Sequence, residues 1–199
     1  MARLRLATLV LVGLAAGASG GLAADEPETA PPPPLADFFG GPFSLIDHNG
    51  TRRTDRDFRG RYMLIYFGYA TCPDICPTGL QTLSTALDLL GARADAVQPL
   101  FITVDPARDR PEVLKDYVSH FHPRLIGLTG GESEIRAVAK AYRIHRRKVV
   151  LADSAGPDDY LVDHGSITHL MGPDGKHVTL FPHGADAQRM AEVLARYLP

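Results

Sequence analysis

Hydrophobic residues form two different patterns along the chain, and segments with the two patterns alternate. Short uninterrupted apolar runs predict buried strands at residues 62–67, 98–104 and 125–128. Between and after these runs, apolar residues recur every three or four positions, which is typical of helices with one buried face. These helices are expected at residues 78–90, 111–121, 133–142 and 185–198.

Two tight-turn sequences predict hairpins at the two ends of this pattern. Asp-His-Asn-Gly at 47–50 separates the short runs 43–47 and 51–54, and Gly-Pro-Asp-Gly at 172–175 precedes a strand at 177–181. Further candidate strands lie at residues 144–151, 160–162 and 166–171. The sequence therefore predicts an α/β fold, in which helices flank a central mixed β-sheet and an extra hairpin precedes the sheet.

Residues 1–24 have the pattern of a signal peptide. Arg3 and Arg5 precede an apolar run at 6–18, and small residues follow it. The alternative is an uncleaved N-terminal membrane anchor, although the run is shorter than the roughly 20 residues that a spanning helix needs. Residues 25–40 are rich in proline and predict an extended linker. The remaining residues, 41–199, contain neither a repeat nor a second linker and are expected to form one domain.

Composition narrows the choice of partners. The formal net charge of the 199 residues is −2, so the chain lacks the basic excess of a nucleic-acid-binding protein. Export would place the domain in an oxidising compartment. Cysteines that act as thiols there would require a reductant.

The chain contains only two cysteines, Cys72 and Cys76, and they lie between the strand at 62–67 and the helix that follows. Pro77 suits the first helical position, which would make Cys76 the cap, where the positive end of the helix favours a thiolate. Two thiolates one turn apart can bind one soft metal ion. A cysteine pair at the first strand–helix junction also indicates a thioredoxin-like architecture.

A purely structural disulfide is the alternative interpretation of this pair. It would close a very short loop and would stabilise the fold weakly. The neighbouring prolines and Asp74 suit a shaped, reactive loop better. Asp74 itself is either a residue that supports the site or a former of the turn.

Eight histidines offer a third metal ligand. His164 is the best candidate, because it lies between two predicted strands and Asp163 beside it could orient its ring. We expect ordinary solvated or structural roles for the other seven, and those at 169, 177 and 183 are expected on the hairpin surface. No ligand spacing among them supports a second metal site.

The motif Cys72-Pro-Asp-Ile-Cys76-Pro, followed far downstream by Val-Asp-His164, resembles the SCO/SenC family. The likeness extends from about residue 41 to the C-terminus. It includes further matching segments at 41–43, 57–60, 64–68, 104–106, 108–109 and 172–175. The chain departs from the family pattern at Gly165, where a hydroxyl residue is common, and at His169, which occupies the place of an aromatic residue.

This resemblance implies an exported, thioredoxin-fold copper protein. Its copper ligands would be Cys72, Cys76 and His164, with Asp74 and Asp163 in supporting positions. The same cysteines could cycle through a redox-active disulfide. One copper ion per chain is expected, as Cu(I), Cu(II) or both, since two thiolates and an imidazole suit copper. Zinc would prefer a fourth protein ligand.

The implied function is that of a metallochaperone that delivers copper to the CuA site during cytochrome c oxidase assembly. The expected partners are the copper-bearing oxidase subunit, a copper donor and a thiol reductant. The expected location is the periplasmic side of a bacterial inner membrane, either soluble after cleavage or anchored. The alternative function is an exported thiol–disulfide oxidoreductase, although such enzymes usually have two residues between their cysteines, not three. A peroxidase-like thiol enzyme would explain neither the pair nor His164.

Overall fold

The computed structural model describes residues 35–156 and 158–199. The expected leader at 1–24 and residues 25–34 of the expected linker lie outside the described residues. The C-terminal part of that linker contains a short helix, α1 (Leu35–Phe38). Among the described residues, no helix combines the length and the apolar character that crossing a membrane requires.

Seven strands form one mixed sheet in the order β2-β1-β5-β4-β3-β8-β9. The strand pairs β3–β4 and β4–β5 are parallel, whereas β8 and β9 continue the sheet antiparallel on one side and β1 and β2 do so on the other. The mixed sheet and the N-terminal hairpin predicted from the sequence are confirmed. The strands are β1 (Ser44–Asp47), β2 (Arg52–Thr54), β3 (Tyr62–Gly68), β4 (Val97–Thr103), β5 (Ile126–Thr129), β8 (Thr168–Met171) and β9 (His177–Phe181).

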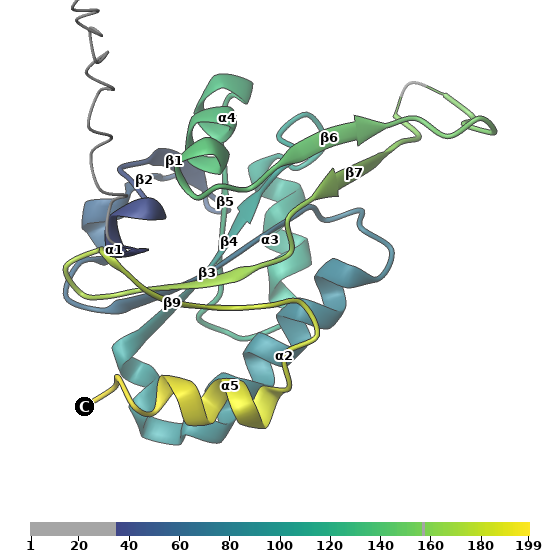
Figure 1. The fold of residues 1–199 in the computed structure, drawn as a ribbon. Helices are drawn as coiled ribbons and strands as arrows, with labels where there is room; N and C mark the ends of the chain where they lie inside the picture. The colour runs from purple at the N-terminus through teal and green to yellow at the C-terminus, as the bar shows by residue number, and fades with distance from the viewer. Residues whose placement is uncertain (1–34, 157) are drawn as a thin grey trace, which may run out of the picture. The chain divides into compact units, whose positions relative to one another are not determined.

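Helices cover both faces of this sheet (Figure 1). On one face α2 packs against α5, and α3 packs on β5. On the other face α4 contacts β1, and α1 contacts β9. The helices are α2 (Ile75–Leu90), α3 (Pro111–Ser119), α4 (Glu132–Ala141) and α5 (Ala187–Leu194), and two 3-10 helices span Asp55–Phe58 and Gly91–Ala96.

The apolar runs form the centre of the core. All seven residues of β4 and the last six of β3 are buried, because helices cover these central strands on both faces. Alternation therefore disappears from these strands, and each appears in the sequence as a continuous apolar segment. The end of β3 places the cysteine loop at the edge of this rigid core.

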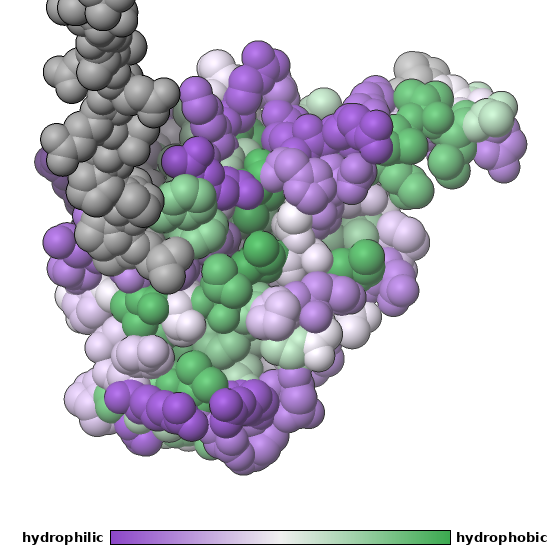
Figure 2. Space-filling model, viewed as in Figure 1, coloured by the Kyte–Doolittle hydropathy of each residue, from purple (hydrophilic) through white to green (hydrophobic). Residues whose placement is uncertain are grey.

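The basic segment at 144–151 forms a strand, but this strand lies outside the central sheet. Strand β6 (Arg146–Val149) pairs with β7 (Leu161–His164) as a separate antiparallel hairpin that extends from the body of the domain (Figure 1). Its connecting loop exposes Val150 and Leu151, at 63% and 47%, and apolar residues gather there on the surface (Figure 2). His164 is the last residue of β7, not part of a loop between strands.

Candidate metal centre

The cysteine loop begins where β3 ends at Gly68. A Cβ atom at this position would lie 2.8 Å from the Cys76 sulfur and 2.9 Å from Phe101, so glycine allows the buried sulfur to approach the strand. The backbone N–H of Cys72 donates to the Tyr69 carbonyl at 3.1 Å, which closes a tight turn. These contacts direct both sulfurs toward the same side of the loop.

The structure corrects the expected start of the following helix. Helix α2 begins at Ile75, with Asp74 as its N-cap, so Cys76 lies in the first turn and is not the cap. Pro77 is the third helical residue. Proline is tolerated there because the first N–H groups of a helix have no intrahelical acceptor.

Three predicted ligands come together at this helix terminus. The sulfurs of Cys72 and Cys76 and a ring nitrogen of His164 all lie within 4.8 Å of one another. The Cys76 sulfur is 3.5 Å from His164 Nε2. Cys76 is buried, whereas Cys72 and His164 are partly exposed, and both cysteines are free. The candidate site therefore has one interior ligand and two ligands that face the solvent.

The electrostatics of the pair differ from the sequence expectation, which favoured a thiolate at Cys76. The pKa of Cys72 is lowered to about 3, chiefly by a hydrogen bond from the Cys76 thiol and further by His164 and the backbone N–H groups of Cys76 and Asp74. The pKa of Cys76 is raised, first by its bond to Cys72 and then by burial. Cys72 therefore carries the thiolate, chiefly because its sulfur accepts a hydrogen bond from the Cys76 thiol, and further because His164 and the N–H groups of Cys76 and Asp74 stabilise it.

The ring of His164 is oriented by a backbone group. Its Nδ1 lies 2.9 Å from the Gly165 carbonyl, which leaves Nε2 directed at the cysteines. Asp163, which we expected to orient this ring, bonds instead to His145 at 3.4 Å and Arg147 at 3.2 Å. The side chain of Asp74 accepts a bond from Thr78 at 3.4 Å.

Tyr69, which was not predicted from the sequence, connects the cysteine loop to the histidine strand. Its ring meets the His164 ring edge to face, with centroids 5.7 Å apart. Its hydroxyl interacts with Cys72 and with the backbone of Val162 on β7. The position directly after Phe-Gly and three residues before Cys72 was the only signal in the sequence.

Asp109 is a second contributor that the sequence did not reveal. Its carboxylate accepts bonds from the Ala70 N–H at 3.0 Å and the Thr103 hydroxyl at 2.6 Å. Asp109 is fully buried, and this burial is the main reason why its pKa is raised to about 6. It ties the start of the cysteine loop to the end of β4.

Of the three histidines expected on the hairpin surface, one is fully buried and a second is only partly exposed. His169 is 0% exposed, and burial lowers its pKa to about 4. His177 is partly buried, and burial lowers its pKa as well. His183 is exposed, as expected.

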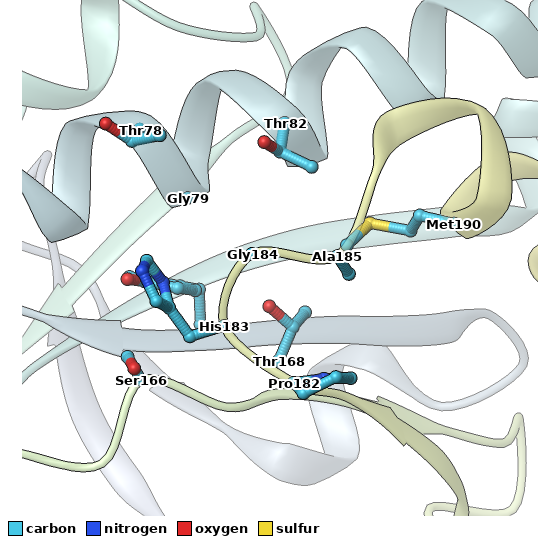
Figure 3. Close-up of a pocket in the computed structure, with 11 residues that line it drawn as sticks. Thr78, Gly79, Thr82, Ser166, Thr168, Pro182, His183, Gly184, Ala185 and Met190 are labelled. Atoms are coloured by element: carbon cyan, nitrogen blue, oxygen red, sulfur yellow. The ribbon is translucent and has the colours of Figure 1, made fainter.

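Two cavities lie close to the cysteine loop. One, of about 340 Å³, is lined by Cys72, His164 and apolar residues that include Ile75 and Leu161. The other, of about 100 Å³, lies between α2 and the segment that joins β9 to α5 (Figure 3). Thr78, Thr82 and His183 line this smaller cavity, and Ser166 lines both. Neither cysteine lines the smaller cavity, so the metal-type site opens into the larger one.

A mixed sheet flanked by helices, with two cysteines and a histidine converging at the first strand–helix junction, defines a thioredoxin-like protein with a three-ligand metal-type centre. The model of the SCO1/SenC family matches residues 32–199. The chain belongs to this family.

Relatives in the family come from distant organisms. Protein sco1 of Schizosaccharomyces pombe is 43% identical over 160 residues, which is 80% of this chain and 60% of that protein. The human mitochondrial SCO1 homolog is 40% identical over 166 residues, which is 80% of this chain and 53% of that protein. The chain thus spans a little over half the length of these relatives.

Solved structures show the same fold. The copper-bound ScoI of Arabidopsis thaliana superimposes with a TM-score of 0.74 at 39% identity, over 80% of this chain and 97% of that one. The copper-bound ScoI of Bradyrhizobium japonicum gives a TM-score of 0.73 at 43% identity, over 80% and 99% of the two chains. The thioredoxin-like fold expected from the sequence is confirmed.

Proposed function

We propose that the chain binds one copper ion through Cys72, Cys76 and His164 and delivers it to the CuA site during assembly of cytochrome c oxidase. The convergence of the three donor atoms within 4.8 Å carries this proposal. In the described part of the chain, no other group of three or more histidine, cysteine or acidic side chains is placed to hold a metal. Two copper-bound relatives at about 40% identity support it.

The donor set fits copper. Two thiolates are soft ligands that select Cu(I), and an added imidazole also suits Cu(II). A structural zinc site would require a fourth protein ligand. When bound, the ion would be held at Cys76 from the interior and at Cys72 and His164 from the solvent side.

Partial exposure suits transfer of the ion. A donor or acceptor can reach Cys72 and His164 through the 340 Å³ cavity while Cys76 still holds the metal from within. Ile75 and Leu161 line this cavity and are exposed at 41% and 37%. They offer apolar contact for the copper-bearing oxidase subunit, which we propose as the acceptor.

The remaining parts of the pathway follow from the expected leader. We propose that the domain acts after export, on the periplasmic side of a bacterial inner membrane. A copper donor and a thiol reductant would then be required, because the oxidising compartment favours the disulfide between Cys72 and Cys76.

A thiol–disulfide reductase is the second candidate function. The free thiols and the low pKa of Cys72 favour it, because a thiolate is the attacking species in disulfide exchange. The two functions use the same cysteines and differ in their need for His164.

The test is an anaerobic Cu(I) titration of the reduced chain against a chromophoric Cu(I) chelator. We expect one tightly bound ion, loss of at least 100-fold in affinity in Cys72→Ser and in Cys76→Ser, and a smaller loss in His164→Ala. His164→Ala should affect Cu(II) binding most, seen as a changed absorption spectrum. His183→Ala, at an exposed histidine, is the matched control. No tight copper, together with rapid reduction of a protein disulfide, would favour the reductase instead.

A further inference from the structure

Two histidines and a methionine lie together on the face of the sheet opposite α2. Met171 on β8 is paired with His177 on β9, and His169 lies two residues before Met171. Residues two apart on a strand share a face, and so do directly paired residues on neighbouring strands. Thr168 lines the cavity next to α2, so its neighbour His169 points to the other face. The three side chains therefore form a triangle that is separate from the cysteine site.

Three of the four ring nitrogens in this triangle are buried and have no hydrogen-bond partner among the described residues. This holds for Nδ1 and Nε2 of His169 and for Nε2 of His177, and all three atoms are buried. His169 has no exposed surface. A buried polar atom without a partner costs about 1–3 kcal/mol, so such atoms are rare and usually have a ligand or another function.

The spacing of the two rings is suitable for one shared ion. Their centroids are 5.7 Å apart and their planes are inclined by 72°. Two imidazoles that bind the same ion, each through a bond of about 2 Å, place their centroids roughly 5–6 Å apart. Met171 is the strand partner of His177, so its side chain starts from the position beside that ring.

We propose that His169, His177 and Met171 form a second Cu(I) site, independent of the cysteine site. Imidazole and thioether ligands together favour Cu(I), whereas Mg²⁺ and Ca²⁺ require oxygen ligands, and the thioether disfavours zinc. The Phe39 ring covers the two histidines, at 5.3 Å from His169 and 4.8 Å from His177 between centroids. Both rings are held in an apolar surrounding that excludes water from the ion.

His177 is the residue of the three that lies nearest to the solvent. This residue is only partly buried, whereas His169 and Met171 are fully buried. The Met171 methyl lies against Gly40, where a Cβ would come within 2.6 Å of it. An ion that enters would therefore first meet His177 and then reach His169 and Met171.

The test uses the full chain with Cys72→Ser and Cys76→Ser combined, which removes the cysteine site and makes the result independent of the proposed function. Anaerobic titration with tetrakis(acetonitrile)copper(I) is expected to load one ion. Adding His169→Phe or His177→Phe should weaken binding at least tenfold while keeping the aromatic packing, and Met171→Leu should weaken it less. His183→Ala should leave binding unchanged.

A second measurement keeps all the histidines in place. In ¹⁵N-labelled protein with the two serine substitutions, Cu(I) should shift the ring-nitrogen NMR signals of His169 and His177 and leave that of His183 in place. Absence of bound Cu(I), or equal shifts at all histidines, would overturn the proposal. A change at His169 and His177 that also follows addition of acetonitrile alone would overturn it as well.

Discussion

Replacement of Asp109 by asparagine tests how the cysteine loop is tied to the core. The carboxylate accepts bonds from Ala70 N–H and the Thr103 hydroxyl, and its other oxygen, Oδ1, is buried without a partner among the described side chains. Asparagine keeps one acceptor oxygen for both bonds. It removes the negative charge, which burial and the neighbouring Asp105 make unfavourable.

The magnitude follows from the pKa. Folding raises the pKa of Asp109 from 3.8 to about 6, so the folded protein holds this proton more tightly than the unfolded chain does. The contribution of Asp109 to stability is therefore most favourable at low pH and is lost as the pH rises from 3.8 to about 6. A difference of this size corresponds to about 3 kcal/mol in total. About 2 kcal/mol of it falls between pH 4.5 and 7.5.

Urea unfolding of the reduced protein, followed by circular dichroism at 222 nm, measures the effect. The free energy of unfolding of Asp109→Asn minus that of the wild type should increase by about 2 kcal/mol from pH 4.5 to pH 7.5. Any constant packing cost of the amide cancels in this change. Asp116→Asn makes the same chemical change at an exposed site and serves as the control. A difference that stays constant across this pH range would refute the argument that Asp109 is protonated more readily in the folded state.

Two further predictions concern the N-terminal end of α2 and the cysteine loop before it. Iodoacetamide at pH 6 should alkylate Cys72 well before Cys76, because Cys72 is partly exposed and its pKa is lowered to about 3. Peptide mass spectrometry measures the ratio of the two alkylated cysteines. Equal labelling would contradict the assignment of the thiolate to Cys72. Gly79→Ala should destabilise the fold by about 1–3 kcal/mol in urea, although alanine favours a helix by about 1 kcal/mol. The reason is that the new Cβ would lie 2.8 Å from the Tyr66 ring and hydroxyl. Gln81→Ala is the control, and a stabilised Gly79→Ala would show that the ring moves freely.

Much of the fold is predictable because the hydrophobic pattern of the sequence is clear. Strands β3 and β4 are continuous apolar runs, and each helix has one apolar stripe, so their order was evident from the sequence. The placement of β6 outside the central sheet was not. A four-residue basic strand has no period that distinguishes the edge of a large sheet from a separate hairpin.

The candidate metal ligands were predictable from the sequence, but the protonation of the cysteines and the burial of nearby histidines were not. Cys72, Cys76 and His164 were identified from residue type and motif. The location of the thiolate depends on which sulfur accepts the hydrogen bonds of the other thiol, of His164 and of the N–H groups at the start of α2, and this geometry is not visible in the sequence. The burial of His169 was missed because the rings of Phe39, Phe67 and Tyr142, which are distant in the sequence, surround its ring on a face of β8 that was expected to be surface.

The fold supports the three candidate ligands, Cys72, Cys76 and His164, in different ways. Cys76 is fixed by the core, since its sulfur fills the space that Gly68 leaves beside β3. His164 belongs to a hairpin that pairs only with itself, and it is 88 residues from Cys76 in the chain. Tyr69 connects these two parts through its ring and its hydroxyl. If these three groups hold an ion, its exchange should begin at Cys72 or His164, which are partly exposed, and end at Cys76, which is buried.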